Sequence, residues 1–563
     1  MQQNKDGERK LFKLCGLFSL VVLFSSSVLF SQSFEDFKRS QASSFAKYAD
    51  ERDNAFNNYL KAEWKAYAVH KGVKLYEEPK PKKIAPATPK KIKSVGPKVS
   101  IKVKKIKYIE PKPVQKFIVV KKPVIEKKKV VVKQTEPEKV KIKKKAEVKK
   151  KIEAKKEVEV KKTKPKKVKI EKKVKIEKKV EAKKEVKQIK IPKKITLPVV
   201  QKDISFDFFG STLGFDVPDG IKSARYYPHN QKGIRNFFNS AASSKYKQFL
   251  QDINDARKAM SLNDWGTYLL VLKISDNIYT NRDNSRLLSW FIFNKMGYAV
   301  KIGLAKKHIV LMHYSKKIIY STPNYSFGKK KFYVVANYAK GSVGKLYSYK
   351  QDYPGANKPL DLSLDTLPKF KYNTKMESLS FKEYGHRYSV DYIYNQNLIN
   401  FMATYPQADY ETFFNAPMDE RSYQSIASGL KKYLDGKKAS NALNFVLHFV
   451  QKSFKYEMDN QQFGREKVMF AEETLYYKKS DCEDRAILYS YLVKELFGID
   501  VVGVKYKDHM ATALYIPMSG DSVKDGSRKF VIADPTYINA SIGQSMPKYR
   551  SKRPESFIVV KKN

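Results

Sequence analysis

One cysteine, one histidine and one aspartate follow each other near the C-terminus at intervals of 27 and 25 residues. Cys482 stands in KKSDCEDRAILYSYLVKELFGI, His509 in VVGVKYKDHMATALYI and Asp534 in KFVIADPTYINA. The spacing of apolar residues in the first segment predicts a helix that starts at the cysteine, with Ser480 or Asp481 as its cap. Unpaired amides and the helix dipole at such a start favour a thiolate.

The two later segments have the composition of strands, and they carry groups that could assist a thiol. An imidazole can take the proton of Cys482, and a carboxylate can fix the imidazole tautomer. The three residues, in chain order, are therefore predicted to be the nucleophile, the base and the orienting acid of an enzyme that catalyses acyl transfer on an amide. The alternative is coincidence, with Cys482 a small core residue and Asp534 a turn former before Pro535.

DCEDRA on a helix, DH on a strand and ADPTY on the next strand resemble the transglutaminase-like superfamily of papain-type α+β folds. The DCED form is closer to bacterial transglutaminase-like cysteine peptidases than to cross-linking enzymes. Residues 443–459 and 461–477 also resemble exported bacterial members. The resemblance covers about residues 440–545, and it does not decide between a peptidase and a transferase.

The resemblance implies a role for each residue of the candidate triad. Cys482 would be the nucleophile, His509 the general base and Asp534 the orienting acid. The oxyanion would bind the backbone amide of Cys482 and one upstream group, for which Gln461 or Gln462 is a candidate.

Three carboxylates, those of Asp481, Glu483 and Asp484, surround the cysteine and should raise its pKa. The resemblance implies calcium bound beside this turn, and hard oxygen ligands at this density suit calcium. The alternative is that Glu483 and Asp484 stabilise the helix start and pair with Arg485. Calcium is thus a candidate cofactor, and the triad itself requires none.

Several other classes of site lack their residues in this sequence. Two cysteines exclude a disulfide scaffold and a cysteine-based zinc site. The seven histidines include no HExxH motif, and no glycine pattern fits a nucleotide-binding loop. A metal hydrolase of that type, a dehydrogenase and a P-loop ATPase are therefore not expected.

The N-terminus predicts export. Basic residues precede an apolar run from Leu14 to Phe30, and small residues offer a cleavage site before Phe34. Residues 1–33 are therefore expected to be a signal peptide or, alternatively, an uncleaved membrane anchor. Either would place the protein in the periplasm or cell envelope.

Aromatic residues then recur every eleven positions from Phe34 to Tyr67, a spacing that keeps them on one face of a helix. We expect one amphipathic, coiled-coil-like helix over residues 34–78. Its apolar face could support self-association through residues 34–67, docking on an envelope partner, or packing on the protein's own C-terminal domains.

A Lys-rich, disordered linker is predicted over residues 79–197. Residues 80–194 hold 46 lysines, 12 glutamates and two aromatic residues, and they carry +34 of the chain's net charge of +55. A segment with this charge and so few rings cannot bury enough surface to fold. It is expected to act as a tether that also binds anionic cell-envelope polymers, and its lack of arginine argues against specific nucleic-acid recognition.

The part of the chain that is expected to fold begins at residue 198. Its sequence predicts an α+β fold in three parts. Residues 436–563 would form the catalytic domain of papain-like, transglutaminase-like fold. Residues 366–435 would form a connecting α/β region, and residues 198–365 a degenerate copy of the catalytic domain.

The hypothesis of a degenerate copy is based on segments of similar sequence in the two halves. SRLLSWFIFNKMGYAVKIG parallels DRAILYSYLVKELFGIDVVGV, His308 parallels His509, and Thr322 stands where the later segment has Asp534. The place of the cysteine holds only Asn281, Arg282 or Asp283.

The sequence thus predicts an exported cysteine enzyme that acts on protein or peptide amides, most simply as a peptidase or amidase at the bacterial cell envelope. The alternatives are a non-catalytic envelope scaffold, an anionic-polymer-binding protein, and a cross-linking transglutaminase.

Overall fold

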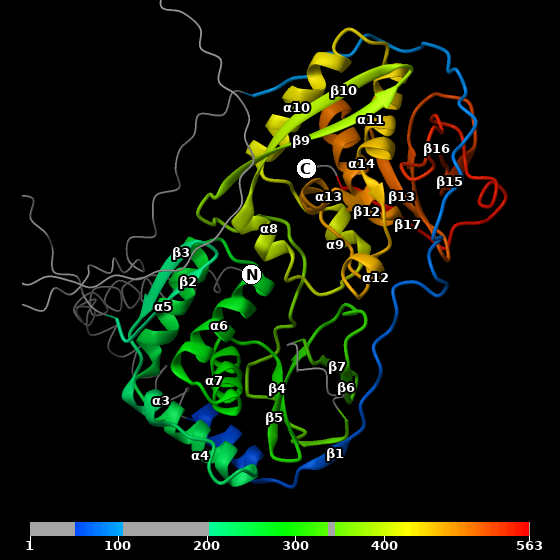
Figure 1. Cartoon of the computed structure of the whole chain (residues 1–563). Coiled ribbons are helices and arrows are strands. Elements are labelled where there is room, and N and C mark those ends of the chain that lie inside the picture. Colours follow the sequence, from blue (N-terminus) through cyan, green and yellow to red (C-terminus); the bar gives the residue numbers. More distant parts are fainter. Residues whose placement is uncertain (1–50, 105–201, 336–343, 562–563) are drawn as a thin grey trace, which may run out of the picture. The chain divides into compact units, whose positions relative to one another are not determined.

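A computed structural model describes residues 51–104, 202–335 and 344–561 (Figure 1). The predicted signal or anchor, the first part of the repeat helix and most of the Lys-rich linker lie outside these residues. Within them the protein is a mixed α and β structure. None of the described helices is long and apolar enough to cross a membrane.

The first half of the folded chain contains a β-hairpin, a group of helices and a six-stranded sheet. The hairpin and helices are β2 (Ile204–Phe208), β3 (Ser211–Phe215), α3 (Asp219–Ser223), α4 (Gln231–Ala242), α5 (Tyr246–Ala259), α6 (Asp264–Ile278) and α7 (Arg282–Lys295). The sheet strands are β1 (Lys65–Tyr67), β4 (Val300–Ala305), β5 (His308–Tyr314), β6 (Asn324–Phe327), β7 (Lys330–Tyr333) and β8 (Leu346–Ser348).

A long hairpin and three helices connect the two halves. They are β9 (Thr374–Glu383), β10 (His386–Asn395), α8 (Gln396–Met402), α9 (Tyr410–Phe414) and α10 (Glu420–Leu434). The hairpin packs on two helices: α10 lies against β10, and α11 (Ala439–Ser453) lies against β9.

The C-terminal half is built around a second sheet of five strands. Its helices and short strands are α11 (Ala439–Ser453), β11 (Lys455–Tyr456), α12 (Asp459–Gln462), α13 (Ala471–Tyr477), β12 (Lys479–Ser480) and α14 (Cys482–Phe497). The sheet strands are β13 (Val501–Lys505), β14 (Met510–Leu514), β15 (Ser522–Asp525), β16 (Arg528–Ala533) and β17 (Ser556–Val559).

Helix α14 is the buried centre of this half. It packs on α11 on one side and on β13 and β14 on the other, so its first twelve residues are all buried. Asp481 caps its start, and Gly498 ends it at a φ of 66°, which glycine adopts without strain. The helix predicted to start at Cys482 is thereby confirmed.

The two sheets have the same strand order. One reads β6-β7-β5-β4-β8 and the other β15-β16-β14-β13-β17, and every pairing in both is antiparallel. In each half a helix precedes the sheet and packs on its first two strands, α7 on β4 and β5, and α14 on β13 and β14. Another helix packs on that one, α6 on α7 and α11 on α14. The halves therefore share a helix, helix and five-strand topology.

The proposed residue matches between the halves need correction. Arg282 begins α7 as Cys482 begins α14, but Thr322 precedes β6 whereas Asp534 follows β16. Thr322 is therefore not in the position of the acid. His308 is largely exposed at the start of β5, where its Nδ1 lies 3.2 Å from Asp283 Oδ2.

The predicted helix over residues 34–78 ends much earlier than expected. The described part is helical from residue 51 to 61, after which residues 65–67 form β1 and pair with β8. Pairing with an open strand edge outweighs the helical period here, since tertiary contacts override local propensity. The apolar face packs within the chain, with Phe56 fully buried and its ring 5.1–5.7 Å from four aromatic rings, those of Phe238, Trp290, Tyr349 and Tyr353.

The predicted start of the disordered linker at residue 79 is also wrong. Residues 79–104 follow the C-terminal half as a segment without helix or strand, drawn in blue in Figure 1. Ala87 N–H donates to Ile538 O over 2.7 Å, and Val99 N–H donates to Lys437 O over 2.9 Å. The valines, isoleucines and prolines interleaved with lysine supply the contact, and Ile101 is 2% exposed.

His313 offers a test of the first half's core. It lies in β5 against the rings of Tyr268 and Phe293, and neither ring nitrogen has a hydrogen-bond partner in the described chain. Burial lowers the pKa of His313 to about 3. The native state therefore stays neutral at this site while the unfolded chain takes a proton below about pH 6.5, so stability is lost as the pH falls.

His313→Phe should remove this loss. Compared with the original chain, the variant should gain about 2–3 kcal/mol of unfolding free energy between about pH 7 and pH 4.5. Denaturant unfolding at several pH values measures it, with His386→Phe as an exposed control. A pH-independent difference for His313→Phe would contradict the account.

Candidate active site

Cys482 is the first residue of α14, and its side chain is completely buried. The helix start is fixed by carboxylates, because Asp484 Oδ2 accepts the Asp481 N–H over 3.3 Å and Asp484 Oδ1 accepts the Met469 N–H over 2.8 Å. The backbone amide of Cys482 belongs to the first helical turn, which has no intrahelical acceptor. A thiol at this place can approach an acyl group whose oxygen meets that amide.

His509 and Asp534 form the pair predicted from the sequence. His509 Nε2 lies 2.9 Å from Asp534 Oδ2, and both residues are buried. The other oxygen, Oδ1, accepts the amides of Thr536 and Tyr537 over 2.9 and 3.2 Å. A carboxylate oxygen accepts, so Nε2 is the donor of this bond and Nδ1 is the ring nitrogen that does not contact Asp534.

His509 is held by the elements around it. It precedes β14 by one residue, as Asp534 follows β16 by one, and paired strands bring the two together. The Tyr549 ring stacks on the imidazole at 4.8 Å between centroids, and its hydroxyl donates to Asp508 Oδ1 over 2.9 Å. Among the described residues, His509 Nδ1 has no hydrogen-bond partner.

Cys482 begins α14, the helix that packs on β14, and His509 directly precedes that strand. Yet the thiol donates to Glu483 Oε2 over 3.2 Å, and in the described part of the chain it makes no hydrogen bond to His509. The structure therefore joins the candidate base to the candidate acid, whereas the candidate nucleophile is bonded to Glu483.

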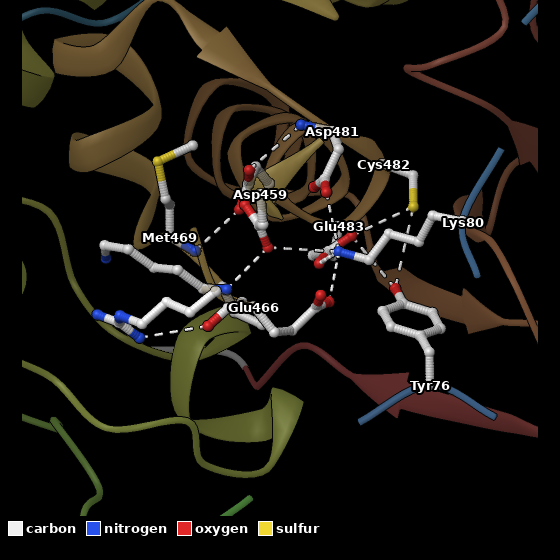
Figure 2. Close-up of polar contacts among 12 residues, drawn as sticks. Tyr76, Lys80, Asp459, Glu466, Met469, Asp481, Cys482 and Glu483 are labelled. Atoms are coloured by element: carbon white, nitrogen blue, oxygen red, sulfur yellow. Dashed lines mark hydrogen bonds and ion pairs between the residues drawn. The ribbon is translucent and has the colours of Figure 1, made fainter. Parts of the chain in front are cut away.

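Four carboxylates, which we call the carboxylate cluster, surround the ammonium group of one lysine, Lys80 (Figure 2). Lys80 Nζ lies 2.6 Å from Glu466 Oε1, 2.8 Å from Asp481 Oδ2 and 3.5 Å from Asp459 Oδ2, and it also contacts Glu483 Oε1. Its side chain is 5% exposed. One positive charge thus sits among four carboxyl groups.

Tyr76 lies over the thiol from the same segment. Its hydroxyl donates to Glu483 Oε2 over 3.2 Å and lies 3.9 Å from Cys482 Sγ (Figure 2). The Lys80 ammonium group lies 4.8 Å from the centre of the Tyr76 ring. Sequence analysis missed both residues, and nothing in their local pattern distinguishes Lys80 from its neighbouring lysines.

Burial and charge set the pKa values of these groups. Burial raises the pKa of Cys482 well above its usual range, and the charges of Glu483 and Asp481 raise it further, whereas Lys80 lowers it. Burial alone would lower the pKa of Lys80, but the carboxylate cluster raises it well above normal. Burial, with the charge of Asp481, raises the pKa of Asp459 to about 8. In this arrangement the thiol is neutral.

The residues proposed for calcium separate in the structure. Asp481 and Asp484 lie with Asp459 in a buried group whose carboxylate oxygens come within 4.8 Å of one another. Asp481 Oδ1 is buried there without a hydrogen-bond partner among the described residues. Glu483 belongs to a second such group, with Asp459 and Glu466, and its carboxylate oxygens accept from Lys80, Tyr76 and Cys482.

Other expectations about this site are corrected. Arg485 does not pair with Glu483 or Asp484: its guanidinium donates to Gln451 O and Phe454 O at the end of α11 and to Ser480 Oγ. Gln461 and Gln462, the candidates for the oxyanion, lie on α12. In the described residues neither side chain forms a hydrogen bond to Cys482.

No family model matches this chain, and no curated protein or solved structure is significantly similar to it.

Asp459 offers a test of the charge balance. Because its pKa is raised from 3.8 to about 8, the native state keeps a proton that the unfolded chain loses, and stability falls as the pH rises through this window. Asp459→Asn does not titrate. The variant should therefore gain stability relative to the original chain between about pH 5 and pH 8, by at least about 1 kcal/mol.

Denaturant unfolding across this pH range measures the effect. Glu457→Gln is the matched control, because Glu457 lies two residues upstream and pairs with Lys455 and Lys479 outside the carboxylate cluster. Glu457→Gln should not raise the free energy of unfolding above that of the original chain at any pH. Equal pH profiles for Asp459→Asn and the original chain would show that the cluster carries no excess charge.

Proposed function

We propose that the protein is a cysteine enzyme of the transglutaminase-like superfamily, acting by acyl transfer on protein or peptide amides, most simply as a peptidase or amidase. The observation that carries the proposal is the bond from His509 Nε2 to Asp534 Oδ2, with His509 Nδ1 left without a partner in the described residues. The buried Cys482 begins α14, the helix that packs on the strand directly after His509.

The proposed reaction has two stages, acylation of Cys482 and hydrolysis of the resulting thioester. His509 Nδ1 takes the proton of Cys482, the thiolate attacks the amide carbon, and the C–S bond forms as the oxyanion meets the helix-start amide. The C–N bond then breaks, and the imidazolium gives its proton to the leaving amine. His509 then takes a proton from water, the hydroxide attacks the thioester carbon, the C–S bond breaks, and the imidazolium returns its proton to the Cys482 sulfur. Asp534 holds the ring throughout.

Two other functions give different products. An amine acceptor in place of water would make the protein a cross-linking transglutaminase. A scaffold or anionic-polymer-binding protein would give no product, and the Lys-rich segment would then be the region that binds its partners. Hydrolysis creates new amino termini, cross-linking releases ammonia and forms isopeptide bonds, and a scaffold does neither, so product analysis separates the three.

Calcium remains a proposed cofactor, with Asp459, Asp481 and Asp484 as its ligands. Hard carboxylate oxygens suit this ion, and the unpartnered Asp481 Oδ1 is an atom that a cation would satisfy. Bound calcium would supply positive charge that favours the thiolate. Asp481 and Asp484 otherwise form the cap at the start of α14.

Calcium binding can be measured without activity. Added calcium should raise the unfolding temperature of the full chain, magnesium should do so less, and Asp484→Asn should remove the calcium effect. Glu457→Gln, outside the ligand set, should keep it. An unfolding temperature independent of calcium in the original chain would contradict the proposal.

The setting of the enzyme is proposed from the sequence. Residues 1–33 would export or anchor it, and the Lys-rich segment would tether it in the periplasm or cell envelope and bind anionic polymers there. Self-association through residues 34–67 would have to use side chains other than Phe56, Leu60 and Trp64, which are buried within this chain. The residue 202–365 half would be a copy without nucleophile or acid.

Replacing each triad residue tests the proposal. Cys482→Ala should abolish product formation from a mixture of unfolded protein fragments, with a change in unfolding free energy within about 1 kcal/mol. His509→Ala should lower the rate by about 10²–10⁴-fold, and Asp534→Asn by about 10²-fold or more. Mass spectrometry of new termini measures both rates. His308→Ala, the corresponding change in the other half, is the control and should leave the rate unchanged.

Two results with Cys482→Ala would contradict the proposed enzyme. Product formation that survives Cys482→Ala would remove the nucleophile from the account. Loss of stability equal to the loss of activity in Cys482→Ala would mark a core cysteine instead.

A further inference from the structure

We propose that residues 74–80, which we call the cover segment, shut the candidate active site, and that Lys80 latches them to the carboxylate cluster. The inference rests on the proposed function, since only a site with a nucleophile has something to shut. It assigns regulation of that site to this chain's own residues, which lie about 400 positions before Cys482.

The cover segment blocks the thiol directly. Cys482 is 0% exposed, and Tyr76, itself 8% exposed, lies with its hydroxyl 3.9 Å from Sγ. Glu483 Oε2 accepts hydrogen bonds from both the Tyr76 hydroxyl and the thiol. An acyl substrate has to reach Sγ, and no substrate can do so while Tyr76 is in place.

Lys80 holds the segment down through charge. Its ammonium group contacts four carboxylates, and burial makes each contact worth more than a surface ion pair. When Lys80 leaves, the remaining carboxylates gain water as the segment lifts, so opening does not strand a buried charge.

The cover segment lies between two fixed ends. Upstream, His70 pairs with Asn324, and Ser321 N–H donates to Val73 O over 2.8 Å. Downstream, Ala87 N–H donates to Ile538 O over 2.7 Å. In the described chain no backbone-to-backbone hydrogen bond holds residues 74–86, although the Tyr456 hydroxyl donates to Pro81 O.

This geometry defines how the site opens. Side-chain contacts, chiefly those of Tyr76 and Lys80, fix the segment, and a surface pocket lies between it and Asp459, Glu466 and Asp481. Residues 74–86 can lift as a loop while both ends stay bound. The thiol then loses its cover and becomes free to turn from Glu483 to the unpartnered His509 Nδ1.

Alkylation of Cys482 by iodoacetamide in the full chain tests the cover. Tyr76→Ala should speed alkylation at least about tenfold, because a buried thiol reacts only through local opening. Tyr76→Phe keeps the ring and should stay close to the original rate. Glu78→Ala, on the same segment but exposed, is the matched control and should change nothing. Intact-mass spectrometry follows the reaction, and circular dichroism checks the fold.

A second variant leaves every contact of the site unchanged. A protease recognition sequence inserted between Lys82 and Lys83, both exposed, allows one end of the loop to be cut after folding. Cutting should raise the alkylation rate by a similar factor. The proposal is overturned if neither Tyr76→Ala nor cutting speeds alkylation of a folded chain.

The outcomes also separate the cover from the proposed enzyme. Faster alkylation in Tyr76→Ala without any amide product from either chain supports the cover and removes the enzyme. Equal alkylation rates together with amide products that require Cys482 overturn the cover and leave the enzyme standing.

Discussion

A single ammonium group, that of Lys80, lies among four buried or partly buried carboxyl groups beside the start of α14. Buried carboxylates repel one another strongly, and breaking such a set by removing its counter-charge typically costs about 3–5 kcal/mol when the site stays closed. Asp481 and Glu483 flank Cys482 in the sequence, so the same interaction fixes the surroundings of the thiol. Most other features of the site follow from the position of Lys80 in the sequence, far upstream of α14.

Because Lys80 belongs to a segment far upstream, the chain must pass over the C-terminal half to deliver it. The segment is fixed at Val73 and again at Ala87, and between these points it brings Tyr76 onto the thiol. The result is a nucleophile that is buried, neutral and bonded to Glu483. His509 meanwhile keeps the orientation that a base requires, through Asp534 on one side and Tyr549 on the other.

The sequence is informative about this site wherever the signal is local. The cap residues and apolar spacing around Cys482 predict a helix start, and composition predicts the strands beside His509 and Asp534. Each of these residues lies at the end of an element, where a short window of sequence determines its position.

Other features depend on contacts between distant residues. Nothing near Lys80 separates it from the other lysines of a Lys-rich stretch; only the fold shows that it meets Asp459 and Asp481. The end of the first helix at residue 61 likewise depends on the open edge of β8, which no pattern around residue 61 reveals. The shared strand order of the two sheets is a further feature of topology, visible in sequence only as weakly parallel segments.

The account holds that Cys482 is a nucleophile which pairs with His509 once the cover segment has lifted. Titration of the thiolate by its ultraviolet absorbance, in the full chain carrying Tyr76→Ala, tests this most directly. The account predicts that the thiol ionises at a lower pH than in the original chain, and that His509→Ala in the same background returns its pKa to a higher value, because an imidazolium no longer stabilises the thiolate. A thiol whose titration is the same with and without His509 would contradict it.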